Sequence, residues 1–284
     1  MVAQGDTGVD AVTGEEIQGV AIPPRAPEQA MKQKPVNAFA ELMSQKPKPR
    51  PADPAKKPWE GKNFFGGRDG LNAYCVDPEA FGADRIISYN DKFVMIWDMF
   101  PKADIHTLVL PRDQDKNVLH PFDAFENPEL LAETKTEVEK AKQLVATELR
   151  RRYGRLSATE QARNKAMEAD ELPDQLPPGR DWLKSVKAGI HAHPSMTHLH
   201  VHVMSTDNVN DCLRHGKHYE SFNTDFLVPL EAFPLAKDDP RRHPKTNGII
   251  DQDLICWRCG KNFGRKFAKL KAHLDDEFEA WKKE

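Results

Sequence analysis

The feature that most constrains the fold is a run of three histidines at every second position, in His198-Leu-His-Val-His-Val-Met204. Side chains of a β-strand alternate between its two faces, so this run predicts a strand with all three imidazoles on one face. The apolar residues between them then point into a core. Three rings with pKa values near ~6.5 repel one another once protonated and contribute little to packing, which disfavours a purely structural role.

Two chemical interpretations of these histidines remain open at this point. Three imidazoles can bind a zinc ion, as they do in zinc hydrolases. Alternatively, a row of imidazoles binds an extended phosphate chain, with one histidine acting as a covalent nucleophile. The linear spacing and the hydroxyl of Ser195 on the approach turn favour the second interpretation.

The segments around this run predict an α+β domain. Three apolar, β-rich stretches are expected to form successive antiparallel strands at residues 86–89, 93–97 and 106–110. A long helix should begin at Asn127-Pro128, because Asn caps helices well and Pro suits the first helical position. The polar residues 153–180 predict a surface excursion.

The first 60 residues have a different composition. They contain nine of the 22 prolines and few aromatic residues, so they cannot bury enough apolar surface to offset chain entropy. We expect a disordered arm over residues 1–62. Its short amphipathic segment, residues 37–43, is either a transient helix or a docking motif for a partner protein. No secretory signal, apolar run of membrane-spanning length or strongly basic overall charge is present; the net charge is -3.

Several separated motifs carry a family resemblance. The alternating run is the signature of the histidine triad (HIT) superfamily of nucleotide hydrolases and transferases. Its wider context resembles the aprataxin family from about residue 68 to the C-terminus, through the motifs Phe100-Pro-Lys-Ala-Asp-Ile-His106, His191-Ala-His-Pro-Ser-Met196 and Lys217-His-Tyr-Glu-Ser-Phe-Asn-Thr224. Since no forkhead-associated domain precedes these motifs, the chain is similar to the shorter fungal type. The resemblance implies removal of AMP from 5′-adenylated DNA ends left by abortive ligation.

The same resemblance implies roles for individual residues. His200 would attack the α-phosphorus and form an AMP–histidine intermediate, while His198, His202 and Ser195 would hold the phosphate oxygens. The leaving phosphate would be neutralised by His191 and Lys102, and His106 would support the site. His193 departs from the family motif, and is either a surface or supporting residue or an extra phosphate contact.

A C-terminal unit predicts a zinc finger. Cys256 and Cys259 form a C-x-x-C pair, and His273 follows on a predicted helix. Glu277 lies four residues further on, one helical turn away and on the same side, so we assign a Cys₂-His-Glu site. Fungal aprataxin fingers of the C2HE type support this assignment. Asp276 is a rival ligand, and a metal-free hairpin is the alternative.

The finger and the segment before the HIT domain predict DNA contacts. A basic run with no acidic residue between Cys259 and His273 is expected to bind DNA phosphates; it comprises Lys261, Arg265, Lys266, Lys269 and Lys271. In aprataxins an aromatic residue wedges against the terminal base pair. The matching segment here contains Phe65 and Arg68, although Phe65 could equally anchor the arm onto the core.

The predicted organisation has four parts: an arm over residues 1–62, a HIT-like catalytic domain over 63–235, a linker over 236–250, and a zinc finger over 251–284. We expect one structural zinc ion, no organic cofactor, a monomer, a nuclear location, and a possible repair-protein partner for the arm. The alternatives are a general HIT hydrolase of free dinucleotides or nucleotide phosphoramidates and a non-catalytic zinc-finger module that binds DNA.

Overall fold

A computed structural model of the protein describes residues 67–284. The predicted arm, its segment 37–43 and Phe65 lie outside the described residues. In chain order the elements are α3 (Asn72–Val76), η1 (Pro78–Ala80), β1 (Ile86–Tyr89), β2 (Phe93–Trp97), β3 (His106–Pro111), α4 (Pro121–Ala124), α5 (Pro128–Tyr153), α6 (Ala158–Met167), η2 (Trp182–Ser185), β4 (Val186–His191), β5 (Val201–Ser205), α7 (Gly216–Asn223), β6 (Leu227–Val228), η3 (Leu230–Ala232), η4 (Pro240–Arg242) and α8 (Phe267–Trp281).

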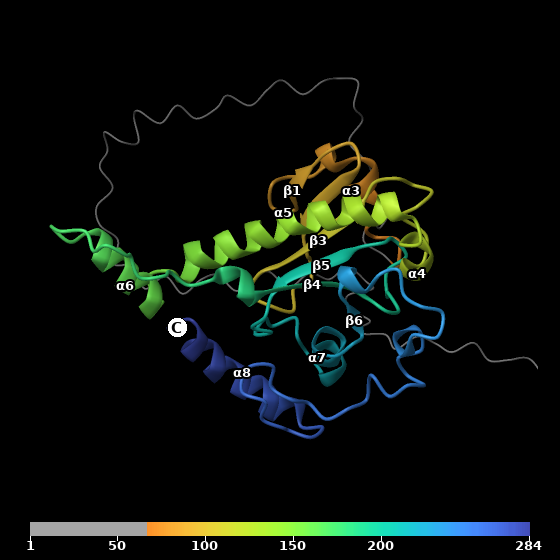
Figure 1. The fold of residues 1–284 in the computed structure, drawn as a ribbon. Helices are drawn as coiled ribbons and strands as arrows, with labels where there is room; N and C mark the ends of the chain where they lie inside the picture. The colour runs from red at the N-terminus through yellow and green to blue at the C-terminus, as the bar shows by residue number, and fades with distance from the viewer. Residues whose placement is uncertain (1–66) are drawn as a thin grey trace, which may run out of the picture. The chain divides into compact units, whose positions relative to one another are not determined.

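The strands form a six-stranded antiparallel sheet in the order β1-β2-β3-β5-β4-β6, with β5 at its centre (Figure 1). The three strands predicted before residue 111 are confirmed. Helix α5 begins where predicted, since the Asn127 side chain accepts hydrogen bonds from the backbone N–H groups of Glu129 and Leu130 at 3.0 and 3.1 Å. The α+β class is therefore confirmed.

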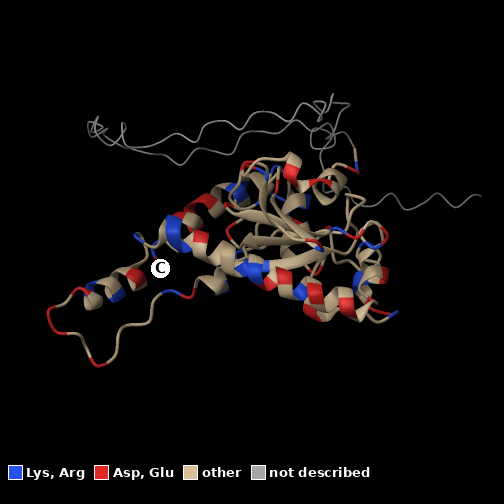
Figure 2. Ribbon diagram, turned by 90° about the horizontal axis from the view of Figure 1, so that it is seen from above, with Lys and Arg blue, Asp and Glu red and all other residues tan. Residues whose placement is uncertain are grey.

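Helix α5 runs across one face of the sheet, and the main core lies between them (Figure 1). Apolar residues along one side of α5, including Val138 and Val145, pack in the same cluster as Val201 and Val203 of β5. The exposed side of α5 alternates basic and acidic residues (Figure 2). Such a mixed surface lacks the single sign of charge that a DNA backbone attracts.

The strand predicted over the histidine run is shorter than expected. Regular pairing begins only at Val201, so His198 and His200 precede β5 in an unpaired segment. There the N–H of Leu199 donates to the backbone carbonyl of Asn117 instead of to a neighbouring strand. The predicted alternation nevertheless holds, because Leu199, Val201 and Val203 all enter the main core.

The excursion after α5 contains a helix that was not predicted. Helix α6 is capped by Ser157, whose hydroxyl accepts from the N–H of Glu160 at 3.4 Å. The spacing Ser157-x-x-Glu160 is that of a capping box, a sequence signal that could have identified this helix start.

The C-terminal finger shares a core with the HIT domain. Trp281 at the end of α8 is 3% exposed and joins the main core, beside Tyr153 and Trp182. The guanidinium of Arg180 lies 4.3 Å from the ring centroid of both Trp182 and Trp281. Within the predicted linker, Ile249 and Ile250 are also buried. The domain boundaries remain a prediction, but these contacts tie the finger to the HIT domain.

Candidate active site and zinc centre

The three histidines of the signature lie on the sheet face opposite α5. His202 is in β5 and stands between Leu108 of β3 and Gly189 of β4. His198 and His200 precede it, and all three side chains are buried. The ring centroids of His200 and His202 are 4.9 Å apart. The structure therefore brings the predicted triad together.

A chain of hydrogen bonds determines the protonated nitrogen of His202. The backbone N–H of Lys102 donates to Nδ1 of His106 at 3.1 Å, so the hydrogen of the neutral His106 ring is on Nε2. That Nε2 lies 2.9 Å from Nδ1 of His202, which must then accept. The hydrogen of neutral His202 is consequently on its Nε2, which is buried and has no hydrogen-bond partner among the described residues.

His200 has the same free nitrogen, Nε2, but in the opposite protonation state. Its Nδ1 lies 2.7 Å from the backbone carbonyl oxygen of His198, and a carbonyl only accepts. The hydrogen of the neutral His200 ring is therefore on Nδ1, which leaves a lone pair on Nε2. A neutral imidazole with this tautomer has a nucleophilic nitrogen, whereas His202 in its tautomer presents an N–H donor.

Burial lowers the pKa of every histidine in this group, because desolvation penalises the charged imidazolium. The pKa of His106 falls to about 4, and those of His191 and His202 fall well below the ordinary value. The pKa values of His198 and His200 are lowered as well, chiefly by burial. The rings are therefore neutral near pH 7, the state that the tautomer assignments require.

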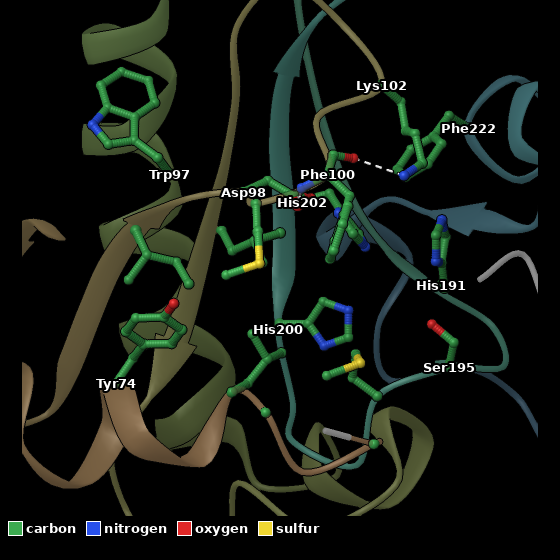
Figure 3. A pocket seen from close by; sticks show the side chains of 17 residues that line it. Tyr74, Trp97, Asp98, Phe100, Lys102, His191, Ser195, His200, His202 and Phe222 are labelled. Carbon is green, nitrogen blue, oxygen red and sulfur yellow. Dashed lines mark hydrogen bonds between the residues drawn. The ribbon is translucent and has the colours of Figure 1, made fainter. Parts of the chain in front are cut away.

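Three of these histidines, His191, His200 and His202, open onto one pocket (Figure 3). Lys102 and Ser195 line the same pocket. His191 and Ser195 lie on one side of His200 in the view, with Tyr74 on the opposite side. The ammonium of Lys102 donates to the carbonyl of Phe100 at 2.7 Å. His106 and His198 do not line the pocket; the ring of His106 contacts His202, and the backbone carbonyl of His198 contacts His200.

Sequence reasoning assigned no role to several residues of this pocket, among them Asp98, Tyr74 and Phe222. Asp98 lines it and lies 3.4 Å from Nε2 of His106, and Tyr74 adds an aromatic wall. Phe222 packs against His191 and His202, with ring centroids 4.6 and 5.0 Å away. Asp98 directly follows an apolar strand, and Phe222 belongs to the 217–224 motif, so both had a signal in the sequence.

The alternative of a three-histidine metal site does not fit these residues. Asp98, His106 and His202 are close enough to share an ion, but this group contains only one triad member. The lone pair on Nδ1 of His106 is already used by the Lys102 N–H, so its Nε2 carries a hydrogen. That nitrogen cannot serve as a ligand in this tautomer.

The predicted zinc ligands, in contrast, fit a metal. The ligand atoms of Cys256, Cys259, His273 and Glu277 all lie within 4.8 Å of one another. Nε2 of His273 is 3.1 Å from Sγ of Cys259 and 3.3 Å from Oε1 of Glu277. Two thiolates, an imidazole and a carboxylate form a donor set that zinc accepts.

Neighbouring residues support this choice of ligands. The second carboxylate oxygen of Glu277 accepts a hydrogen bond from Arg258, which orients the carboxylate. The rival Asp276 is exposed and does not belong to the group.

The predicted DNA contacts divide into two sets. Lys261, Lys266 and Lys269 are exposed on the finger. Arg265 is exposed as well, but its guanidinium pairs with Glu220 at 3.0 Å, and the ammonium of Lys271 donates to the carbonyls of Val209 and Asn210 at 2.6 and 2.9 Å. These two side chains connect the finger to the HIT domain.

The remaining predicted contacts lie elsewhere. Exposed Arg68 donates to the carbonyl of Pro194 at 3.3 Å, beside Ser195 of the pocket. His193 is exposed, and its Nε2 lies 3.2 Å from the carbonyl oxygen of Arg242. His193 does not line the pocket. Its position favours a surface or supporting residue over an extra phosphate contact.

Comparisons with known proteins agree with this geometry. The family model described as "HIT domain" matches residues 82–209, and the model described as "C2HE / C2H2 / C2HC zinc-binding finger" matches residues 223–280. An aprataxin-like protein of Schizosaccharomyces pombe is 35% identical over 251 residues, which cover 86% of this chain and 94% of that protein. An aprataxin-like protein of Saccharomyces cerevisiae is 32% identical, covering 75% of this chain and 96% of that protein.

Solved structures give the same result. The crystal structure of the aprataxin ortholog Hnt3 from Schizosaccharomyces pombe has a TM-score of 0.57 and 32% identity, covering 75% of this chain and 94% of that chain. A crystal structure of the aprataxin ortholog Hnt3 in complex with DNA has a TM-score of 0.56 and 32% identity, covering 75% of this chain and 96% of that chain. Among the described residues, no helix is both long and apolar enough to cross a membrane.

Proposed function

The chain belongs to the aprataxin-like proteins of the HIT superfamily, and we propose from this premise that it removes AMP from the adenylated 5′ ends of DNA left by abortive ligation. It is an aprataxin-type hydrolase with a zinc-binding finger. The observation that carries the residue roles is the pair of contacts at Nδ1 of His200 and Nδ1 of His202, which assign a lone pair to Nε2 of His200 and a hydrogen to Nε2 of His202.

In the first step, Nε2 of His200 attacks the α-phosphorus of the adenylate. A P–N bond forms, the P–O bond to the DNA 5′-phosphate breaks, and its electron pair leaves on the DNA phosphate oxygen. The ring becomes positively charged, and the carbonyl of His198 stabilises this charge through the hydrogen bond at Nδ1. Water then attacks the same phosphorus, breaks the P–N bond and releases AMP.

The surrounding donors stabilise charge on the phosphates. The N–H of His202 and the hydroxyl of Ser195 would bind the non-bridging oxygens of the transferring phosphorus. Lys102 and His191, which also line the pocket, would bind the departing DNA phosphate. That phosphate is a weak base, so the demand for a general acid is small.

Asp98 and the apolar wall would hold the nucleoside. Asp98 is an acidic group of the pocket, and a carboxylate accepts hydrogen bonds from sugar hydroxyls. The apolar side chains of Leu71 and Met196, with the ring of Tyr74, line the part of the pocket where a base can stack.

The finger would bind the phosphate backbone of the duplex. The exposed lysines Lys261, Lys266 and Lys269, together with Arg68, are the candidate phosphate contacts. The zinc would be structural, with one ion per chain, because protein side chains fill all four coordination positions. A DNA-repair role also implies a nuclear location.

The test is His200→Ala on nicked DNA with a 5′-adenylate. We expect AMP release to be lost and DNA binding to stay near normal, because the neighbouring donors and the finger remain. An alkaline quench should trap labelled adenylate on the wild-type protein only. His193→Ala is the matched control, because this histidine lies outside the pocket and should keep the wild-type rate.

Two outcomes would contradict the proposal. If His200→Ala keeps more than a few per cent of the wild-type rate, His200 is not the nucleophile. If the wild-type protein cleaves a free nucleotide phosphoramidate but not adenylated DNA, the protein is a general HIT hydrolase.

A further inference from the structure

Lys187 is a partly buried cation with no role in the reaction above. It lies on β4, four residues before His191, so strand periodicity places both side chains on the same face of the sheet. Its strand partner is Met204, two residues after His202. Lys187 therefore lies on the histidine-bearing face but does not line the pocket.

The ammonium of Lys187 has three neutral acceptors. Nζ lies 3.0 Å from the carbonyl oxygen of Phe222, 3.0 Å from Oδ1 of Asn223 and 3.3 Å from Oδ1 of Asn208. Three acceptors match the three hydrogens of an ammonium group. Phe222 and Asn223 form the C-terminal end of α7, where helix carbonyls lack intrahelical partners and a cation is favourable.

The residue held in this way covers the catalytic rings. The side chain of Phe222 is 5% exposed and lines the pocket beside His191 (Figure 3). Its ring also packs edge-on against His202 and His106, with centroids 5.0 and 5.4 Å away. Phe222 thus keeps water from the rings whose neutral state and orientation the reaction requires.

We propose that Lys187 is a positioning residue, which holds the end of α7 so that Phe222 stays packed against His191 and His202. The inference rests on the proposed function. Burial lowers the pKa of Lys187 to about 7, but a neutral amine still donates two hydrogens, so the Phe222 carbonyl keeps a donor in either state. Loss of this anchor lets Phe222 shift and admits water to the phosphate-binding rings.

The test uses Lys187→Met, which keeps the apolar stem and removes the donors, and Lys187→Arg, which retains donors. Single-turnover AMP release at saturating adenylated DNA should fall about 10- to 100-fold in Lys187→Met, because small displacements of reacting groups have effects of this size. The Kd for DNA should change less than about twofold, since the phosphate contacts lie elsewhere. Lys187→Arg should recover most of the rate.

A matched control removes another buried charge far from the pocket. Glu160 is 3% exposed and accepts hydrogen bonds from Trp182 and Arg150 at 3.0 and 3.1 Å. Glu160→Met should lower the melting temperature while keeping the AMP-release rate. Equal loss of rate in this control would mean that Lys187→Met acts through general destabilisation, which overturns the proposal.

A double-mutant cycle with Phe222→Leu tests whether Lys187 acts through Phe222. We expect the double variant to be about as slow as Phe222→Leu alone, because the anchor then has nothing left to position. Fully additive losses, or a wild-type rate in Lys187→Met, would overturn the inference.

If Lys187→Met does not fold, Asn223→Leu removes one of the acceptors that orient the ammonium. A slower release with unchanged Kd then supports the inference, and a wild-type rate overturns it. If the wild-type protein itself releases no AMP, the proposed function fails, and this failure is distinct from that of the Lys187 inference.

Discussion

Single hydrogen bonds decide which histidine nitrogen can react at this site. His200 and His202 are two residues apart on the same face and both buried, yet Nε2 carries a lone pair on His200 and a hydrogen on His202. His200 donates to a carbonyl, whereas His202 accepts from His106. Because a neutral imidazole has one donor and one acceptor nitrogen, the partner of one nitrogen assigns the role of the other.

The lowered pKa values predict the pH dependence of both activity and stability. In the unfolded chain each histidine has a pKa of ~6.5. In the folded chain the pKa of His106 is about 4, and the pKa values of His191 and His202 lie well below that of a free histidine. Between these limits the unfolded state binds more protons than the folded state. The histidines therefore make their whole contribution to the free energy of unfolding above ~pH 6.5, and this contribution decreases as the pH falls.

We therefore expect denaturant unfolding to show steady destabilisation between ~pH 6.5 and ~pH 4.5. Single-turnover AMP release should keep its rate at ~pH 6.5, where an exposed imidazole is half protonated, because burial lowers the pKa of His200. A half-maximal rate at or above that pH would contradict the assignment of a buried neutral nucleophile.

At the level of elements, β4 packs closely against the segment that contains α7 and β6. Gly189 lies between Lys187 and His191 on the same face of β4. A Cβ at this position would lie 2.8 Å from Cγ of Leu227 and 2.9 Å from the carbonyl oxygen of Val228. Since Val228 contributes a backbone atom, the strand pair would have to separate.

Gly189→Ala is accordingly expected to lower the free energy of unfolding by about 1–3 kcal/mol, the usual cost of overpacking. It should also slow AMP release, because α7 leads directly into β6 and carries Phe222. Chemical unfolding and single-turnover kinetics measure the two effects. Gly216→Ala is the control, since its Cβ would meet only Leu254 at 3.5 Å, an ordinary contact. Equal stability of the two variants would contradict this view of the packing.

The metal site combines Cys256 and Cys259 of the C-x-x-C pair with His273 and Glu277 of helix α8, so metal analysis tests both segments. We expect one zinc per chain, lost in Cys256→Ser and in His273→Ala. Glu277→His should retain the metal, because imidazole is also a competent ligand one helical turn from His273. Two zinc ions per chain, one of them lost in His202→Ala, would instead restore the metallohydrolase interpretation of the triad.

Across the whole molecule, the finger is held by contacts that a tethered module would not make. The hydroxyl of Tyr219 donates to the carbonyl of Ile255 at 2.7 Å and accepts from the N–H of Trp257 at 2.9 Å. The indole N–H of Trp257 donates to the carbonyl of Asp207, just after β5, at 3.3 Å. Stability of the finger and of the HIT domain should therefore be coupled.

Trp281→Ala tests this coupling. Removing a large aromatic side chain from a packed core costs about 3–5 kcal/mol, and Trp281 packs against Trp182 and Tyr153 of the HIT domain. We expect one unfolding transition at a markedly lower temperature, measured by calorimetry. Leu172→Ala, at a side chain that is 69% exposed, should leave the transition unchanged. Two separate transitions in the wild-type protein would show that the finger folds independently.

The amino-acid sequence by itself determined the features that depend on local backbone geometry. A period of two placed the triad opposite Leu199 and Val203, and a spacing of four along a helix brought His273 and Glu277 together. The start of α5 followed from its Asn cap. These relations hold because strand and helix geometry convert spacing along the chain directly into direction in space.

Only the tertiary structure decided how those groups are used. The tautomer of His202 depends on His106, which lies 96 residues away in the chain. The spacing within the basic run of the finger does not predict that Arg265 pairs with Glu220 of the HIT domain. Such partners meet because distant segments of the chain pack together. The resulting burial and hydrogen bonds determine which groups are protonated and which are accessible, and neither can be predicted from residue spacing along the chain.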